Sequence, residues 1–191
     1  MTGKIALPVN QAYPISFRFR ENPAWYIKTF GYPHNGCDFA CPIGSVVRSC
    51  DKGTVIFADD IPDQDGCGIV LRHDWGISIY WHLSQLFATL GSVHGQYSVI
   101  GASGATGYVT GAHLHFGIKV EDDPSPGMRG WTDPEKYFNE FPFATPAPSP
   151  ITRTYLVLPG DSLWSIAEKF YNNGLEWRRI YSTKIYIVRC C

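Results

Sequence analysis

Short apolar runs alternate with polar positions over the first 141 residues, and turns rich in Gly, Asp and Pro separate them. Such alternation with a period of two is typical of β-strands that bury one face. It predicts strands of an antiparallel sheet at residues 45–47, 54–58, 68–72, 77–81 and 113–120. We therefore expect a mainly β fold with an antiparallel sheet for this part of the chain.

Only one segment of this part has a helical pattern. It begins after Asp133, has Pro134 in its first turn and runs to residue 141. Residues 142–152 then carry four prolines together with Ala, Ser and Thr. That composition is typical of a semi-rigid, extended linker.

Beyond the linker the pattern predicts a small α+β module at residues 153–191. We expect a strand at 153–158, a helix at 162–170 capped by Asp161, a second helix at 175–182 and a short strand at 185–188. A module of about 40 residues is small for a core of its own. The predicted organisation is a first domain at residues 1–141, a linker at 142–152 and a C-terminal module at 153–191.

Composition and charge exclude several classes of protein. The chain is 45% hydrophobic and 17% charged, which is typical of a globular protein, and its net charge of −1 gives no strong attraction to nucleic acid. No apolar stretch approaches the ~20 residues that span a bilayer. The N-terminus lacks the apolar core of a secretory signal, so we expect either a phage-type release or an incomplete gene. We expect a monomer.

The six cysteines form no CxxC pair, which argues against a structural zinc site made of four thiolates. Cys37, Cys41 and Cys50 stand where small apolar residues would fit the interior of a sheet, so we expect buried reduced thiols. A disulfide between Cys41 and Cys50 is the alternative, and the state of Cys67 is left open.

Candidate chemistry lies in three histidine features. His34 and Asp38 are four residues apart on an extended segment, so their side chains face the same way. His113 and His115 share one face of a predicted strand, and His82 stands alone. A catalytic zinc site needs three protein ligands and one open position for water. His34, Asp38 and one or both of the paired histidines can supply them.

The other two histidines are expected to be structural or solvated. His73 lies at the end of a predicted strand, where a polar residue is common. His94 lies in a polar turn, which favours a solvated side chain over a metal ligand.

Several short motifs follow one another between residues 16 and 120. They are His34-Asn-Gly-Cys-Asp38, Pro42-Ile-Gly44, Gly66-Cys-Gly68, Tyr80-Trp-His82-Leu83, the Gly-rich segment 101–107 and Gly111-Ala-His113-Leu-His115. In this order the chain resembles the lysostaphin/LytM-type zinc endopeptidases. The resemblance implies a β-rich fold with an open groove, one Zn²⁺ ion, and stem or bridge peptides of bacterial peptidoglycan as substrate.

Carried over position by position, the resemblance implies His34, Asp38 and His115 as metal ligands and His113 and His82 as catalytic histidines. The chain has no H-E-x-x-H helix, so a histidine must act as the base. We assign His113 as the base and His82 to the water or the oxyanion, although these two roles could be exchanged. Because all five positions are occupied, we favour an active enzyme over a non-catalytic wall-binding or activator protein. A structural lysin component of a phage particle, which would use the same fold to open a local hole in the wall, is a third alternative.

The C-terminal module resembles the start of a LysM domain, from Thr154 through the predicted first helix. That resemblance implies binding to N-acetylglucosamine-containing glycans through residues Gly160, Asp161, Ser162 and Leu163. The chain departs from the family after Ser182, where a further Pro-Gly-containing strand is usual. The implied glycan site is therefore incomplete in this chain.

Overall fold

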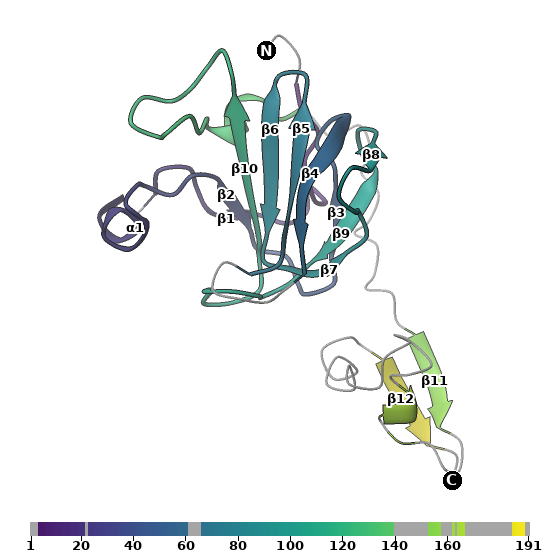
Figure 1. Cartoon of the computed structure of the whole chain (residues 1–191). Helices are drawn as coiled ribbons and strands as arrows, with labels where there is room; N and C mark the ends of the chain where they lie inside the picture. The colour runs from purple at the N-terminus through teal and green to yellow at the C-terminus, as the bar shows by residue number, and fades with distance from the viewer. Residues whose placement is uncertain are drawn as a thin grey trace. The chain divides into compact units, whose positions relative to one another are not determined.

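The computed structural model describes residues 4–21, 23–60, 66–139, 153–157, 162, 164–166 and 185–189. The chain forms two compact units, at residues 1–147 and 148–191, and each is described by itself. The first unit holds every element from β1 to the 3₁₀ helix, and Figure 1 labels its strands.

The first unit is built on a seven-stranded antiparallel sheet, with the strand order β1-β2-β10-β6-β5-β4-β8. In Figure 1, β10, β6, β5 and β4 lie side by side as its long central strands. The strands of this sheet are β1 (Ile15–Phe17), β2 (Cys37–Phe39), β4 (Gly53–Asp59), β5 (Gly68–His73), β6 (Gly76–Trp81), β8 (Val93–His94) and β10 (Leu114–Val120).

A second antiparallel sheet, with the order β3-β9-β7, completes this unit. Its strands are β3 (Val46–Arg48), β7 (Leu83–Leu86) and β9 (Val99–Ser103). The expected mainly β, antiparallel fold is confirmed. Each of the five strands predicted from the sequence is present, with ends shifted by at most one residue, as is usual at element boundaries.

The two faces of the large sheet differ in burial. Phe116, Tyr80 and Ile69 are direct partners on β10, β6 and β5, and all three are fully buried. Together with Val47 and Ile100 of the small sheet they belong to one apolar core. Neighbouring residues along a strand point to opposite faces, so the other face of these strands carries a different set of side chains.

A helix that the sequence pattern did not predict precedes β2. Helix α1 (Pro23–Phe30) brings Tyr26 against the His34 ring, with a centroid distance of 4.8 Å. Pro23 at its first position and Gly31 after its end, at a φ of 79°, are typical helix boundaries and would have located it. Its aromatic residues obscured the helical period. The expectation of a single helical segment in this part of the chain was therefore wrong.

The predicted helix at residues 133–141 is also wrong in extent. It shortens to one 3₁₀ turn, η1 (Pro134–Lys136), which the Asp133 side chain caps by accepting a hydrogen bond from the Glu135 amide. The N-terminal segment of the chain forms hydrogen bonds with the backbone groups that come after this turn. Ile5 donates to the Tyr137 carbonyl and accepts from the Asn139 amide, both at 2.8 Å. These tertiary hydrogen bonds replace those that a longer helix would make.

The second unit contains one parallel pair, β11 (Arg153–Val157) with β12 (Ile185–Arg189). Ser162 and Ser165 exchange the reciprocal hydrogen bonds of a capping box at the start of a helical turn at residues 164–166. Gly160, Asp161 and Leu163 lie outside the described residues, as do most of the predicted 162–170 helix and the whole 175–182 helix.

Four of the cysteines lie in the described part of the first unit. Cys37, Cys41, Cys50 and Cys67 are all buried reduced thiols, so the alternative disulfide between Cys41 and Cys50 is excluded. Burial raises the pKa of the Cys50 thiol to about 12, which makes this thiol a small apolar group at neutral pH.

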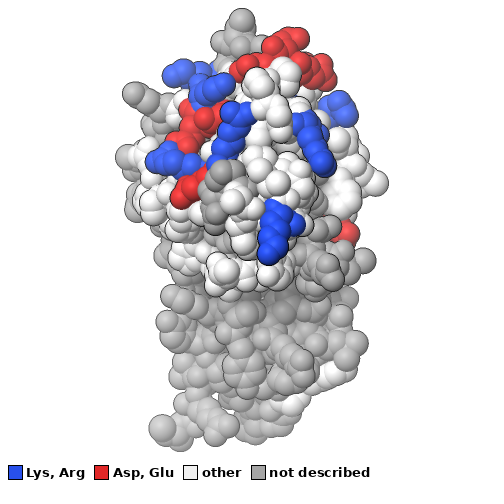
Figure 2. All heavy atoms as spheres, turned by 90° about the vertical axis from the view of Figure 1, so that its left-hand side faces the viewer, with Lys and Arg blue, Asp and Glu red and all other residues white. Residues whose placement is uncertain are grey.

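The face of the molecule drawn in Figure 2 carries charged side chains of both signs. On the face in Figure 2, Lys and Arg side chains lie beside Asp and Glu side chains across its upper half. The helices of the described residues include none that is long and apolar enough to cross a membrane.

Candidate metal centre

The backbone register of two strands brings the first three candidate residues together. Asp38 on β2 is the direct antiparallel partner of His115 on β10, so both side chains project to the same face of the sheet. His34 approaches from the loop before β2. Gly36 permits that approach, because a Cβ at this position would lie 2.3 Å from the Phe116 carbonyl oxygen.

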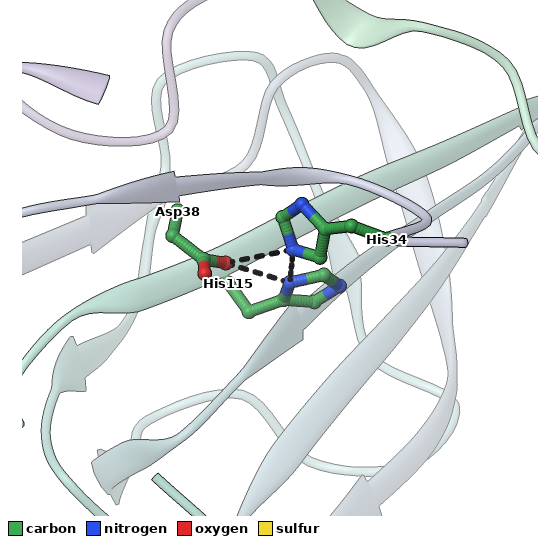
Figure 3. Close-up of side chains that lie close together, drawn as sticks. All are labelled: His34, Asp38 and His115. Atoms are coloured by element: carbon green, nitrogen blue, oxygen red, sulfur yellow. Dashed lines mark hydrogen bonds and ion pairs between the residues drawn. The ribbon is translucent and has the colours of Figure 1, made fainter. Parts of the chain in front are cut away.

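Three ligand atoms converge at this point, as Figure 3 shows. His115 Nδ1 lies 2.8 Å from Asp38 Oδ1, His34 Nε2 lies 3.2 Å from the same oxygen, and the two ring nitrogens are 3.0 Å apart. Tetrahedral zinc with bonds near 2.0 Å places its ligand atoms about 3.3 Å apart. The observed spacing is therefore close to that of a shared ion.

The hydrogen bonds around His34 test whether a cation fits. Its Nδ1 lies 2.8 Å from the Arg18 carbonyl oxygen, which can only accept, so a neutral ring donates there and turns a bare Nε2 lone pair to the cluster. At most one proton, on His115 Nδ1, is then available to three converging acceptor atoms. A divalent cation satisfies all three, and two imidazoles with one carboxylate form a donor set that suits zinc.

Burial and mutual contact tune the protonation of this group. Burial by itself raises the pKa of Asp38, but the close contacts with the His115 and His34 imidazoles outweigh it and hold that pKa well below its usual range. Burial is also the main cause that lowers the pKa of His115. An ionised carboxylate beside a neutral imidazole is the state in which both residues can bind a metal ion.

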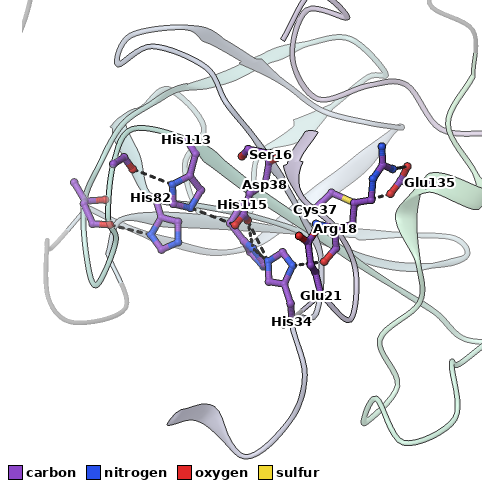
Figure 4. A network of polar contacts seen from close by, with 12 residues as sticks. Ser16, Arg18, Glu21, His34, Cys37, Asp38, His82, His113, His115 and Glu135 are labelled. Carbon is purple, nitrogen blue, oxygen red and sulfur yellow. Dashed lines mark hydrogen bonds and ion pairs between the residues drawn. The ribbon is translucent and has the colours of Figure 1, made fainter. Parts of the chain in front are cut away.

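His113 and His82 lie beside this group but outside the three-atom cluster. His113 Nε2 is 3.8 Å from Asp38 Oδ2, the carboxylate oxygen that faces away from the other two histidines. The His82 and His113 rings are neighbours, with centroids 4.7 Å apart, and Figure 4 shows both on the same side of His115.

Both of these rings are oriented by backbone carbonyls. His113 Nδ1 lies 2.9 Å from the Gly111 carbonyl oxygen, and His82 Nδ1 lies 2.8 Å from that of Thr106. Each neutral ring therefore donates from Nδ1 and keeps Nε2 as a proton acceptor. His82 has a φ of 66°, a strained conformation for a residue other than glycine. Burial lowers the pKa of His82 to about 4, so this ring is neutral at pH 7.

The sequence did not indicate the groups that orient the rings of His34, His82 and His113. The carbonyls of Arg18, Thr106 and Gly111 are backbone atoms, so no side-chain motif marks them. The other two histidines lie apart from the cluster. His73 is buried at the end of β5, and His94 is partly exposed and bonded to the Ser92 hydroxyl.

A second group of potential ligands, Cys37, Asp133 and Glu135, lies on the other side of β2. Its chemistry is already satisfied within the chain. Arg18 forms an ion pair with Glu135, and Asp133 accepts the hydrogen bond that caps η1. The Arg18 charge already balances the Glu135 carboxylate, so among the described residues the cluster of His34, Asp38 and His115 alone has the character of a metal centre.

The chain has recognisable relatives. Residues 32–126 match the family model described as Peptidase family M23. The peptidoglycan DD-endopeptidase ShyA of Vibrio cholerae is 32% identical over 122 residues, which are 64% of this chain and 28% of that protein. The glycyl-glycine endopeptidase of Staphylococcus capitis is 35% identical over 88 residues, 45% of this chain and 24% of that protein.

A solved structure agrees with these matches. A zinc-containing peptidase from Vibrio cholerae superposes with a TM-score of 0.55 at 35% identity, covering 65% of this chain and 39% of that one. The chain spans less than a third of the length of ShyA and of the glycyl-glycine endopeptidase.

Proposed function

We propose, because the chain carries a peptidase family M23 domain, that it is a zinc-dependent endopeptidase that hydrolyses peptide bonds in bacterial peptidoglycan. The observation that carries the proposal is the convergence of His34, Asp38 and His115, whose ligand atoms all lie within 4.8 Å of one another. In this proposal the three residues hold one zinc ion.

Zinc bound at such a site polarises the scissile carbonyl and lowers the pKa of its water towards neutrality. The chain itself supplies the proton transfer. His113 is our choice for the base because its Nε2 faces the metal group and its Nδ1 proton is held by the Gly111 carbonyl. It accepts the proton of the attacking water and later donates it to the leaving amine.

His82 has the second proton-handling role. Its neutral ring lies beside His113, and its position is fixed by the Thr106 carbonyl and an unusual backbone conformation. In the complex with substrate it orients the water or, when protonated, stabilises the oxyanion, a role worth a few kcal/mol in other enzymes. Both rings bind a backbone carbonyl through Nδ1 and leave Nε2 as the acceptor, so the reverse assignment is the alternative.

Peptidoglycan is the proposed substrate because one relative is named a peptidoglycan DD-endopeptidase and another a glycyl-glycine endopeptidase. We propose that residues 1–141 carry the chemistry, that 142–152 link the parts and that 153–191 form an incomplete LysM-like module. This module would hold glycan through Gly160, Asp161, Ser162 and Leu163, of which only Ser162 is described. Tethering would raise the local concentration of peptide near the metal centre.

The test is hydrolysis of isolated peptidoglycan by the purified full chain, followed as loss of turbidity. We expect clearing with zinc, none with a chelator and none with His115→Ala, whereas His94→Ala behaves as the wild type because His94 lies outside the cluster. Clearing that persists in His115→Ala would sink the zinc-peptidase proposal. Retention on the wall without any hydrolysis by zinc-loaded protein would favour a binding protein instead.

A further inference from the structure

An aromatic surface lies next to the metal group on the less buried face of the large sheet. Trp81 on β6 is the direct partner of His115, and Gly68 on β5 is the direct partner of Trp81. Direct partners in an antiparallel sheet project to the same face. The row that begins at the metal group therefore continues through Trp81 and over Gly68, and it ends at Asp59 on β4.

Trp81 rests flat against the backbone of β5. A Cβ added at Gly68 would lie only 1.3 Å from Trp81 Cε3 and 1.5 Å from Cζ3, so the indole occupies the space of the missing side chain. Phe57 on β4 meets the far edge of the indole, with a centroid distance of 5.5 Å and an interplanar angle of 75°. The two rings form one continuous surface across three strands.

This surface is apolar and reaches solvent. Phe57 is 41% exposed and Trp81 is partly exposed. Ile79 and Val70, on the same face one step along the strands, lie between Phe57 and β10. Chemistry at the metal group thus takes place next to Trp81, Phe57, Ile79 and Val70, whose side chains offer dispersion and hydrophobic contact and, among these four, a single polar group, the indole N–H.

We propose that Trp81 and Phe57 are specificity-determining residues that contact the side chain next to the cleaved bond and favour alanyl over glycyl peptides. The inference rests on the proposed peptidase function, because it places the scissile bond at His115. An alanine methyl on this surface loses contact with water, whereas a glycine has no side chain to bury there. A methyl that this surface removes from water corresponds to at most roughly a 4-fold preference, below the 10-fold or more of a closed pocket.

Two soluble tetrapeptides with blocked ends test the preference, Gly-Gly-Gly-Gly and Gly-Ala-Ala-Gly, the second prepared with D- and with L-alanine. We expect the wild type to cleave one alanyl peptide about 4-fold faster in kcat/KM if one methyl contacts the surface, and up to about 16-fold faster if both do. Trp81→Ala and Phe57→Ala should reduce this ratio towards one. Phe87→Ala is the matched control, since Phe87 is a similarly exposed Phe that follows β7 on the other sheet.

Binding to chelator-treated protein, measured by calorimetry or NMR titration, separates this inference from the proposed function. Tighter binding of an alanyl peptide that Trp81→Ala weakens supports the surface even if no peptide is cleaved. Equal binding and equal cleavage of both peptides, or a preference that survives in Trp81→Ala and Phe57→Ala, overturns it. Should Trp81→Ala fail to fold, Trp81→Phe and Phe57→Ala give the same readout, with a partial loss expected for Trp81→Phe.

Discussion

Two buried histidines, His73 in the β5–β6 hairpin and His115 on β10 beside the other end of that hairpin, show what distinguishes a metal site from a structural one. His73 and His115 are 6% and 7% exposed, so burial does not separate them. His73 Nδ1 lies 2.8 Å from the Lys52 carbonyl and Nε2 lies 2.7 Å from the Ser78 hydroxyl, which itself reaches Tyr80. Both ring nitrogens of His73 therefore face a neutral group with which they can share a hydrogen bond.

The other end has the opposite arrangement. His34 Nε2, Asp38 Oδ1 and His115 Nδ1 turn towards one another with at most one proton among them. The His73 end is complete without any ligand, whereas the His115 end is completed by a cation. Convergent lone pairs, and not histidine burial, therefore mark the metal centre.

The largest expected effect comes from Asp38→Asn, which removes the charged ligand. Loss of a residue that only hydrogen-bonds a metal ligand lowers metal affinity by up to ~100-fold. Because Asp38 is itself a proposed ligand, we expect zinc affinity to fall by more than this and peptide hydrolysis to become undetectable. Competition with a chromophoric chelator measures the affinity. His73→Ala serves as the comparison and should bind one zinc ion as tightly as the wild type. Equal zinc affinities for Asp38→Asn and the wild type would refute the ligand assignment.

Removal of either catalytic histidine should separate metal binding from chemistry. His113→Ala and His82→Ala are each expected to lower kcat by about 10²- to 10⁴-fold, the usual contribution of a positioned acid or base. The zinc content, determined by elemental analysis, should stay at one per chain, because neither ring belongs to the three-atom cluster. A variant that loses both zinc and activity would show that its histidine is a ligand.

At the other end of the hairpin, His73→Ala should affect stability and leave chemistry intact. It strands the Lys52 carbonyl and the Ser78 hydroxyl without their ring partner, which corresponds to about 2–3 kcal/mol of unfolding free energy. Urea denaturation of the zinc-loaded protein measures the loss. His94→Ala, which removes a single contact to Ser92, provides the control and should change stability by less than about 1 kcal/mol. A loss of similar size in both variants would contradict the structural role of His73.

The smallest effect concerns pH. Burial lowers the pKa of His73 below its usual value, so the folded state binds its proton less readily than the unfolded chain does. The stabilising contribution of the neutral ring is therefore present above the unfolded pKa of about 6.5 and is lost as the pH falls through the folded pKa. Denaturation midpoints of chelator-treated protein between pH 8 and pH 5 should decrease less in His73→Phe than in the wild type. If the midpoints of the two proteins decrease equally between pH 8 and pH 5, groups other than His73 cause the acid sensitivity.

In the first unit, sequence reasoning located β3, β4, β5, β6, β10 and the histidines, but it did not locate helix α1 or the strands β1, β2, β7, β8 and β9. Alternation of period two identified the long strands because each buries one face against the core, as with Phe116 and Ile69. Helix α1 escaped because its aromatic residues gave no clear helical period, although Pro23 and Gly31 mark its ends. The predicted 133–141 helix failed because Ile5, distant in sequence, takes the backbone hydrogen bonds of Tyr137 and Asn139. Local patterns do not report such long-range competition.

The sequence by itself determined which donors are available and how neighbours on one strand are oriented, since the period of a strand puts His113 and His115 on the same face. Only the tertiary structure decided which donors meet. Asp38 and His115, 77 residues apart, become partners through the register of β2 against β10. The Arg18 carbonyl selects the tautomer of His34, and Gly68 makes room for Trp81 beside the metal centre. These contacts depend on strand pairing and backbone atoms, which no local motif encodes.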